Sequence, residues 1–194
     1  MEHFDIVVIG AGFSGAVMAE RFASQMNKTV LVLEQRPHVA GNCYDYRNEA
    51  GILVHHYGPH LFHTSKQQVW DYLSQFTQWT PYEHKVLGSV DGKLIPIPFN
   101  LNSLAVLYAK EQAEKIEALL ISTYGFDTKV PILELRKRAE PLLQELAEFV
   151  YQKVFVNYTA KQWGCSPEDI SPTVTARVPV VISRDDRYFH DTYQ

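Results

Sequence analysis

The first forty residues contain two short apolar runs, separated by a glycine-rich stretch and a segment with helical periodicity. A short apolar run ends at Ile9, a glycine-rich stretch follows, and a second apolar run ends at Leu33. Between them, apolar residues recur at helical spacing: Val17, Met18, Phe22 and Met26. The pattern predicts a strand, an amphipathic helix and a second strand, which together form one βαβ unit.

Three glycines and one acidic residue in this unit follow the pattern of a dinucleotide-binding site. Gly10 is placed to turn the chain out of the strand, Gly12 to let a pyrophosphate approach the backbone, and Gly15 to let helix and strand pack closely. The pyrophosphate would lie at the positive end of the helix. Glu34 ends the second strand, where an acid accepts hydrogen bonds from an adenosine ribose and disfavours a 2′-phosphate. We therefore expect NAD or FAD rather than NADP.

The loop after Glu34 carries further candidates. Pro37 stops the strand, and Gly41 and Asn42 follow at the carboxyl edge of the predicted sheet, where nucleotides bind in this fold. Arg36 is placed to reach a phosphate, although an ordinary surface arginine fits the pattern equally well.

His60 and His63 flank an apolar pair in the segment Tyr57 to Thr64. Metal ligation usually needs a third protein ligand with supporting carboxylates, and the sequence near these histidines offers none, so we predict no metal. A Gly-Pro turn that holds the histidines over a planar cofactor is the preferred interpretation. A pair of hydrogen-bonded, partly buried histidines is the alternative.

The pattern becomes mainly helical after residue 64. Ser65 is predicted to cap a helix whose apolar face runs to Phe76, and Asp91-Gly92 joins the strands 86–90 and 93–97 in a hairpin. Further helices are expected from Asn102 or Ser103, over 111–124 and over 141–156.

The predicted fold class is α/β, with a Rossmann-like βαβ domain that binds a dinucleotide, NAD or FAD, and a mostly helical inserted domain. The expected parts are 1–64, which binds the cofactor, 65–164, which is helical and faces the substrate, and 165–194, which returns to the first sheet. A cleft between such parts is the usual place for a substrate.

Composition narrows the class of partner. The chain has 194 residues, of which 46% are hydrophobic and 21% charged, and its formal net charge is -4. This balance does not favour nucleic acid or anionic membranes as partners, and no apolar run reaches the roughly 20 residues that span a bilayer. Two cysteines, Cys43 and Cys165, form no disulfide framework, so a cytoplasmic location is the default expectation.

Aromatic residues close the list of candidates. Tyr158 and Trp163 lie in the segment Asn157 to Gly164 and have the ring faces and polar groups that suit stacking on a base or sugar. A pair of core aromatics is the alternative.

Taken together, these segments resemble the amino-terminal half of the UDP-galactopyranose mutase family. The resemblance is carried by the glycine fingerprint with Glu34 and by four blocks, which are Gly41-Asn42, 57–64, 158–164 and 177–189 with Arg177-Val-Pro-Val and Asp186-Arg-Tyr-Phe. It covers essentially the whole chain.

The resemblance implies an isomerase of cell-wall biosynthesis that interconverts UDP-galactopyranose and UDP-galactofuranose. FAD would be needed in its reduced form, with N5 attacking the anomeric carbon. NAD(P)H or another reductant would supply the electrons, and a homodimer is compatible with this reading.

The resemblance also assigns roles by motif. Gly10, Gly12, Gly15, Glu34 and Arg36 would bind the ADP part of FAD, Gly41 and Asn42 would lie further along the cofactor, and His60 and His63 would lie near the isoalloxazine ring, with His63 closer to N5. Tyr158 would stack on uracil and Trp163 would line the same cleft. Arg177 would clamp the diphosphate as the glycosyl bond breaks, with Tyr188 near the diphosphate or sugar.

Two features depart from the family. Val181 stands where many members have a second arginine of an Arg-x-Pro-Val-Arg motif. Members are also about twice as long, so we expect a fragment that is inactive alone and holds FAD weakly or not at all. A flavin oxidoreductase of the amine-oxidase kind and a non-catalytic nucleotide-binding module are the alternatives.

Overall fold

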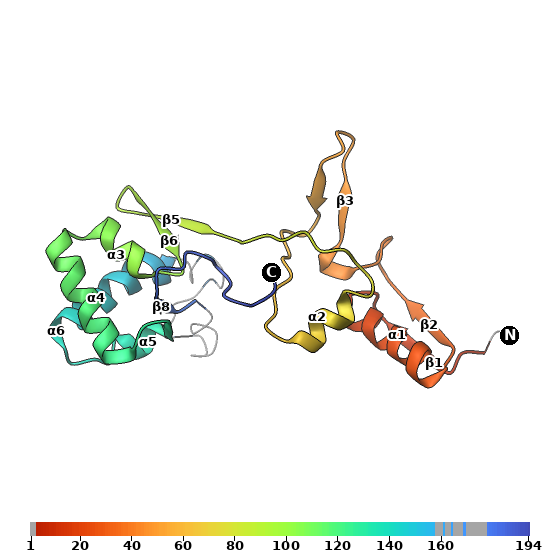
Figure 1. Ribbon diagram of the computed structural model, residues 1–194. Helices are drawn as coiled ribbons and strands as arrows, with labels where there is room; N and C mark the ends of the chain where they lie inside the picture. The colour runs from red at the N-terminus through yellow and green to blue at the C-terminus, as the bar shows by residue number, and fades with distance from the viewer. Residues whose placement is uncertain (1–2, 158–160, 162–163, 165–168, 170–177) are drawn as a thin grey trace. The chain divides into compact units, whose positions relative to one another are not determined.

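The chain forms two compact units (Figure 1). The computed structural model describes residues 3–157, 161, 164, 169 and 178–194. The amino-terminal unit extends to Phe62 and the carboxyl-terminal unit runs from His63 to Gln194. The division falls close to the end of the predicted cofactor-binding part, 1–64.

A parallel βαβ arrangement opens the amino-terminal unit. β1 (Ile6–Ile9) pairs in parallel with β2 (Val30–Leu33), and α1 (Phe13–Met26) carries the chain from the end of one strand to the start of the other. α1 stops at Asn27, which adopts a left-handed conformation with φ 50° and donates its N–H to the carbonyl of Phe22. The predicted Rossmann-like unit is confirmed.

One face of this small sheet is open. Side chains alternate along β1, so that Ile6 and Val8 are half-buried on one face while Val7 and Ile9 are 54% and 86% exposed on the other. The predicted apolar stripe of α1 is only partly covered, because Met18 and Met26 are exposed. Two strands are too narrow to cover the whole stripe of a helix.

A second hairpin, which the sequence pattern did not predict, completes the amino-terminal unit. A short 3-10 turn, η1 (Gly41–Cys43), leads into β3 (Asp45–Arg47), which pairs antiparallel with β4 (Leu53–His55). The side chain of Asn48 closes the connection by accepting N–H groups of Ala50 and Ile52. In Figure 1 the hairpin stands out from the rest of its unit. Its polar, short strands give little periodic signal.

The carboxyl-terminal unit is rich in helices, as expected. The predicted hairpin is confirmed with its turn, because Asp91 and Gly92 have φ values of 49° and 78°, which suit a tight hairpin turn. The elements of the carboxyl-terminal unit, in chain order, are α2 (Gln67–Leu73), β5 (Val86–Val90), β6 (Lys93–Ile97), α3 (Leu101–Leu107), α4 (Lys110–Tyr124), β7 (Thr128–Val130), α5 (Ile132–Leu135), α6 (Pro141–Val150), the π-helical turn η2 (Tyr151–Phe155) and β8 (Val180–Ile182).

Three helix ends differ from the sequence prediction. α3 begins earlier because the side chain of Asn100 accepts the N–H groups of Asn102 and Ser103, and Ser103 bonds back to the Asn100 N–H in a capping box. α6 keeps regular α-helical geometry only to Val150, and the helical path then continues through the wider π-helical turn η2 to the predicted end near residue 156. Ser65 does not cap α2, because its hydroxyl donates to Asp191 instead.

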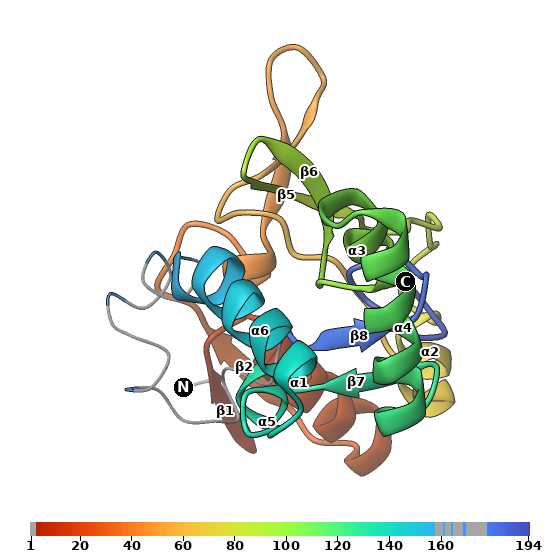
Figure 2. The same cartoon turned by 90° about the vertical axis from the view of Figure 1, so that its left-hand side faces the viewer.

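The core of the carboxyl-terminal unit surrounds β8. β8 pairs antiparallel with β7, and its other edge meets the Phe99 to Leu101 segment, where the Val181 N–H donates to the Phe99 carbonyl over 2.8 Å. Figure 2 shows β7 and β8 side by side between α6 and α4. The strand was expected to return to the first sheet, but it completes the core of the helical unit. Its residues are entirely apolar and therefore suit a strand covered on both faces.

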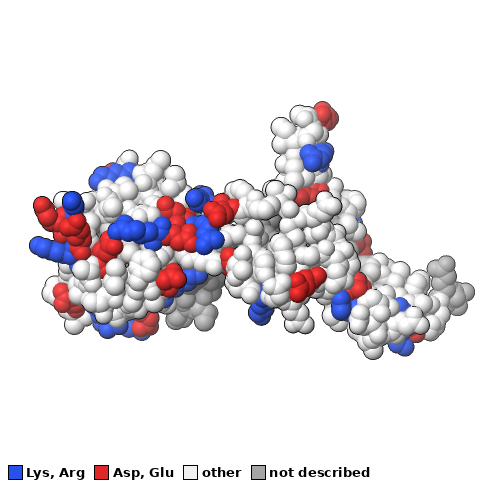
Figure 3. Space-filling view, viewed as in Figure 1, with Lys and Arg blue, Asp and Glu red and all other residues white. Residues whose placement is uncertain are grey.

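Charges on the surface are mixed. On the face that Figure 3 shows, Lys and Arg side chains lie among Asp and Glu. Ion pairs such as Arg136 with Glu148 and Arg184 with Glu117 join opposite charges in the carboxyl-terminal unit. No helix of the part that the structure describes combines the length and the apolar character needed to cross a membrane. Any anion bound on this face would therefore depend on a few local donors.

Hydrogen exchange is expected to separate the two units. Amides of α4 and α6, which surround Ile116, Leu120 and Leu146 at 1% exposure, should exchange slowly, since their opening requires loss of the core. Amides of β1 and β2 should exchange at least about tenfold faster, because no residue of 3–62 is buried. Exchange read by mass spectrometry checks this, and equal protection of β1 and α4 would contradict it.

Candidate functional site

The glycine-rich turn is held by backbone contacts. Gly10 has φ +96°, and its N–H donates to the Leu33 carbonyl over 2.7 Å, so the turn is joined to the end of β2. A Cβ at Gly15 would lie 1.9 Å from the Gly10 carbonyl oxygen, which no side chain can do. Gly15 is therefore required for α1 to lie against β1.

A second contact joins this turn to the loop after β2. The Ala40 N–H donates to the Ala11 carbonyl over 2.8 Å, and a Cβ at Gly41 would lie 3.0 Å from the Gly12 Cα. Gly41 has φ +58° and Ala40 also adopts a left-handed conformation, at φ 74°. The two glycine loops thus meet with bare backbone on both sides.

The N-terminal end of α1 has features that fit a phosphate. Its cap residue, Gly12, has no side chain to bond to the first-turn N–H groups, and the 14-residue helix directs its positive end there. A pyrophosphate accepts such N–H groups well. The residues present fit the phosphates of a dinucleotide.

Glu34 lies at the same place. Its carboxylate accepts the Ala11 N–H over 2.7 Å and the Arg36 N–H over 2.9 Å. The backbone N–H groups of Arg36 and Ala11 hold the pKa of this carboxyl below its usual value. Glu34 is therefore ionised and fixed beside the turn, where the ribose-binding role stays a prediction.

The remaining loop residues form a small cluster. Arg36 donates to the side-chain oxygen of Asn42 over 2.9 Å, and its guanidinium lies 4.6 Å from the centre of the Tyr57 ring. The contacts described above join seven of the predicted cofactor-binding residues: Gly10, Gly12, Gly15, Glu34, Arg36, Gly41 and Asn42. The eighth, His60, has its Nδ1 2.9 Å from the Gly58 carbonyl. Tyr57 is an addition that the sequence analysis did not single out.

His63 belongs to the carboxyl-terminal unit and has different partners. Its Nδ1 lies 2.6 Å from Asp191 Oδ2, and its ring stacks on Phe189 with centroids 3.7 Å apart. Within the described ranges, no group of three His, Cys, Asp or Glu side chains is arranged to hold a metal.

A cavity of about 370 Å³ opens in the carboxyl-terminal unit. Tyr188, a predicted substrate residue, lines it together with Phe155, Lys153 and Lys161. The other walls come mainly from β5 and, apart from Ser89, have no polar side chain: Val86, Leu87, Gly88, Ser89, Val90, Ile97, Val154 and Val178. An apolar cavity with a few cationic and aromatic groups is typical of small-molecule sites. Lys161 lay inside a recognised block, but sequence reasoning assigned it no role.

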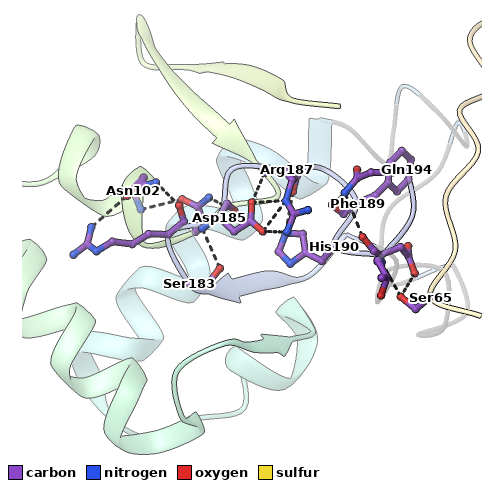
Figure 4. A network of polar contacts seen from close by, with 12 residues as sticks. Ser65, Asn102, Ser183, Asp185, Arg187, Phe189, His190 and Gln194 are labelled. Carbon is purple, nitrogen blue, oxygen red and sulfur yellow. Dashed lines mark hydrogen bonds and ion pairs between the residues drawn. The ribbon is translucent and has the colours of Figure 1, made fainter. Parts of the chain in front are cut away.

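A polar network holds the segment that carries Tyr188 (Figure 4). Arg187 makes paired hydrogen bonds to the Asp185 carboxylate, the shortest over 2.6 Å. The buried Asn100 and its neighbour Asn102 both donate to Asp186 over 2.8 Å. The network links the start of α3 to this segment and fixes the residues that directly precede Tyr188.

Three predicted substrate residues, Tyr158, Trp163 and Arg177, lie outside the described residues. Val181, where an arginine was expected from the family pattern, is 2% exposed within β8. An uncompensated charge would be costly at such a position, so valine suits it.

Gly12 and Gly15 offer a matched pair of substitutions. Gly15→Ala should destabilise the βαβ unit by about 3 kcal/mol or more, because the methyl group collides with backbone. Gly12→Ala should cost under about 1 kcal/mol, since φ is -74° and the nearest atom to the new Cβ, Gly41 Cα, is 3.8 Å away. Limited proteolysis and hydrogen exchange of α1 check this, and equal effects would contradict the packing role of Gly15.

Acid should weaken the segment around Tyr188. The hydrogen bonds from Arg187 lower the pKa of Asp185 to about 2, so its stabilising contribution is present above pH 4 and is lost as the pH falls towards 2. Asp185→Asn should therefore destabilise the protein at pH 6 and have little effect near pH 2. Denaturant unfolding at both pH values checks this. A difference that persists unchanged at pH 2 would contradict it.

Two family models match the chain. A model for an NAD(P)-binding Rossmann-like domain matches residues 8–76, and a model for UDP-galactopyranose mutase matches residues 153–194. The first covers the glycine turn, β2 and the Arg36 loop, and the second covers Lys153, Lys161 and Tyr188.

Whole-chain comparisons agree with these models. A probable UDP-galactopyranose mutase of Klebsiella pneumoniae is 35% identical over 100% of this chain and 50% of its own length. The dTDP-fucopyranose mutase of Escherichia coli is 35% identical over 97% of this chain and 49% of its own. The UDP-galactopyranose mutase of Mycoplasma genitalium is equally similar over 97% and 46%.

A solved structure supports the fold. The crystal structure of reduced UDP-galactopyranose mutase aligns with 93% of this chain and 37% of its own, with a TM-score of 0.60 and 19% identity. The chain spans about half the length of the curated relatives that it matches. Along its whole length, the chain is therefore related to the UDP-galactopyranose mutase family.

Proposed function

We propose that this chain supplies the cofactor-binding and substrate-binding parts of a flavin-dependent mutase that interconverts UDP-galactopyranose and UDP-galactofuranose. The observation that carries the proposal is 35% identity, along essentially the whole chain, to proteins named as UDP-galactopyranose mutases. The glycine turn and the cavity beside Tyr188 lie within the segments that the two family models match.

FAD is the proposed cofactor, and its reduced form is the proposed active state. The open end of α1 and the bare backbone at Gly12 and Gly41 fit its pyrophosphate, and Glu34 fits a ribose. Bound reduced flavin would supply the nucleophile for the anomeric carbon. The chain's own residues would bind, orient and neutralise charge, with Arg36, Asn42 and His60 along the cofactor.

The substrate is proposed to occupy the cavity lined by Tyr188. Lys153 and Lys161 bring positive charge to it, although Lys153 is also paired with Asp91 over 2.7 Å. A cation near the diphosphate would stabilise the charge that develops as the glycosyl bond breaks. Arg177 is proposed for the same task, while Tyr158 and Trp163 are proposed to contact the uracil.

A second substrate has a specific observation in its favour. The dTDP-fucopyranose mutase is as similar to this chain as the UDP-galactopyranose mutases are, at 35% identity. The two substrates differ in the base methyl group, the 2′-hydroxyl and the sugar 6-hydroxyl. We propose UDP-galactose first because more of the compared proteins carry that name.

Ligand titrations of the chain test the proposal. UDP and UDP-galactose should protect the region around β5 and Tyr188 from hydrogen exchange, and dTDP should do so more weakly. Lys161→Ala should weaken UDP binding about tenfold, the usual effect of losing one charge-assisted hydrogen bond. Lys110→Ala, at an exposed position of α4, is the matched control and should change nothing.

Cofactor and turnover are measured separately. Gly12→Ala should weaken FAD binding because its methyl group occupies the approach to the turn, while stability falls by less than about 1 kcal/mol. Turnover is proposed to require the rest of the family's length, and NAD(P)H or dithionite as reductant. If protein of the family's full length, once reduced, leaves UDP-galactose unchanged but consumes oxygen with an amine, the oxidoreductase alternative replaces this proposal.

A further inference from the structure

The His63 ring is held at one edge by a carboxylate. Nδ1 of His63 lies 2.6 Å from Oδ2 of Asp191. An ionised carboxylate can only accept hydrogen bonds, so the shared proton belongs to Nδ1. Since one imidazole nitrogen then carries hydrogen, the neutral ring has an open lone pair on Nε2.

The carboxylate itself is fixed in orientation. Ser65 donates its hydroxyl to the other oxygen of Asp191 over 2.9 Å, and the Thr192 N–H donates to that same hydroxyl over 3.2 Å (Figure 4). Two backbone hydrogen bonds of 2.9 Å between Thr64 and Tyr193 hold the two segments side by side. Neither the carboxylate nor the imidazole depends on a single contact for its position.

Asp191 stays ionised in this setting. Partial burial pushes its pKa up, but the hydrogen bonds from His63 and Ser65 outweigh burial and leave the pKa below its usual value. The positive charge of Lys129 acts in the same direction. The carboxylate therefore remains an acceptor throughout the neutral range.

The face of the imidazole is fixed as well. Phe189 stacks on it with ring centroids 3.7 Å apart and planes at 15°. Rotation of the ring out of this plane would break both the stack and the bond to Asp191, and a half-turn within the plane would break the bond. The His63 side chain keeps 36% of its surface exposed, and no described residue bonds to Nε2.

We propose that Asp191 is a positioning residue that holds His63 with its proton on Nδ1, so that Nε2 is presented as an acceptor for an N–H group of the ligand. The identity of that ligand rests on the proposed function. A reduced isoalloxazine ring carries N–H at N5, whereas the oxidised ring has an acceptor there. An acceptor at Nε2 therefore favours the reduced cofactor.

Nitrogen NMR of the chain, without cofactor, tests the positioning directly. In ¹⁵N-histidine-labelled protein, with the His63 signals assigned by comparison with His63→Gln, the neutral ring should show protonated Nδ1 and unprotonated Nε2. Asp191→Asn should shift the ring towards the Nε2-protonated form, because the amide can donate to Nδ1. Asp45→Asn, an exposed position on β3, is the matched control and should leave the signals unchanged.

A wild-type ring protonated on Nε2 overturns the inference, whatever the variants do. So does an Asp191→Asn protein that folds, by circular dichroism, yet keeps the wild-type His63 signals. If Asp191→Asn fails to fold, Asp191→Glu and the wild-type spectrum decide, since the glutamate retains a carboxylate and should retain the Nδ1 proton.

A titration with FAD tests whether Nε2 of His63 accepts a hydrogen bond from the ligand. The preference for reduced over oxidised FAD should fall about fivefold in Asp191→Asn, which corresponds to one ordinary hydrogen bond. An unchanged preference overturns the assignment of Nε2 to a ligand N–H group. Absence of FAD binding in either redox state would count against the proposed function, while the NMR result would still decide the role of Asp191.

Discussion

Burial is confined to one of the two units, and this constraint governs what each unit can do. All buried apolar side chains of the described residues lie between Val90 and Ile182. In residues 3–62 the βαβ unit is shaped instead by backbone contacts, of which the approach of Gly15 to the Gly10 carbonyl is the tightest. Such contacts define geometry well but add little stability, because they remove little apolar surface from water. The nucleotide-binding geometry is thus formed without a core of its own.

The same constraint explains the departure at Val181. Sequence comparison with the family pattern presents it as a missing charge. In the structure it is a core residue, since β8 is paired on one edge with β7 and bridged on the other at Asn100. Packing in the core is therefore the main constraint on the side chain at position 181. A loss of function at this site does not follow from the substitution alone.

The strongest local signals were read correctly from the sequence, whereas the weakly patterned β3–β4 hairpin and the long-range contacts were missed. The glycine spacing and the Asp91-Gly92 turn specify backbone conformations within a few residues, and both features were found. Ser65 was taken for a helix cap because only its neighbours are visible in the sequence, while its actual partner, Asp191, is 126 residues away. The change from α-helical to π-helical geometry after Val150 was not predicted, because the apolar spacing continues through the π-helical turn.

The candidate site shows the same division. The arrangement of Gly12, Glu34 and Gly41 around the turn was predictable because each position needs a defined local geometry. The role of Lys161 was not, since a lysine gains meaning only from the cavity that it lines.

For His63, the two interpretations that the sequence presented as alternatives are compatible. One was a histidine placed for a cofactor, and the other was a histidine satisfied by a hydrogen bond. The bond to Asp191 satisfies one nitrogen and, by fixing the proton there, defines the other as an acceptor. A structural hydrogen bond and a binding role are therefore compatible in one ring, because an imidazole has two nitrogens whose protonation states depend on each other. The stack on Phe189 fixes the plane of the ring and therefore the direction of the Nε2 lone pair. An acceptor is selective for a donor only when its direction is fixed.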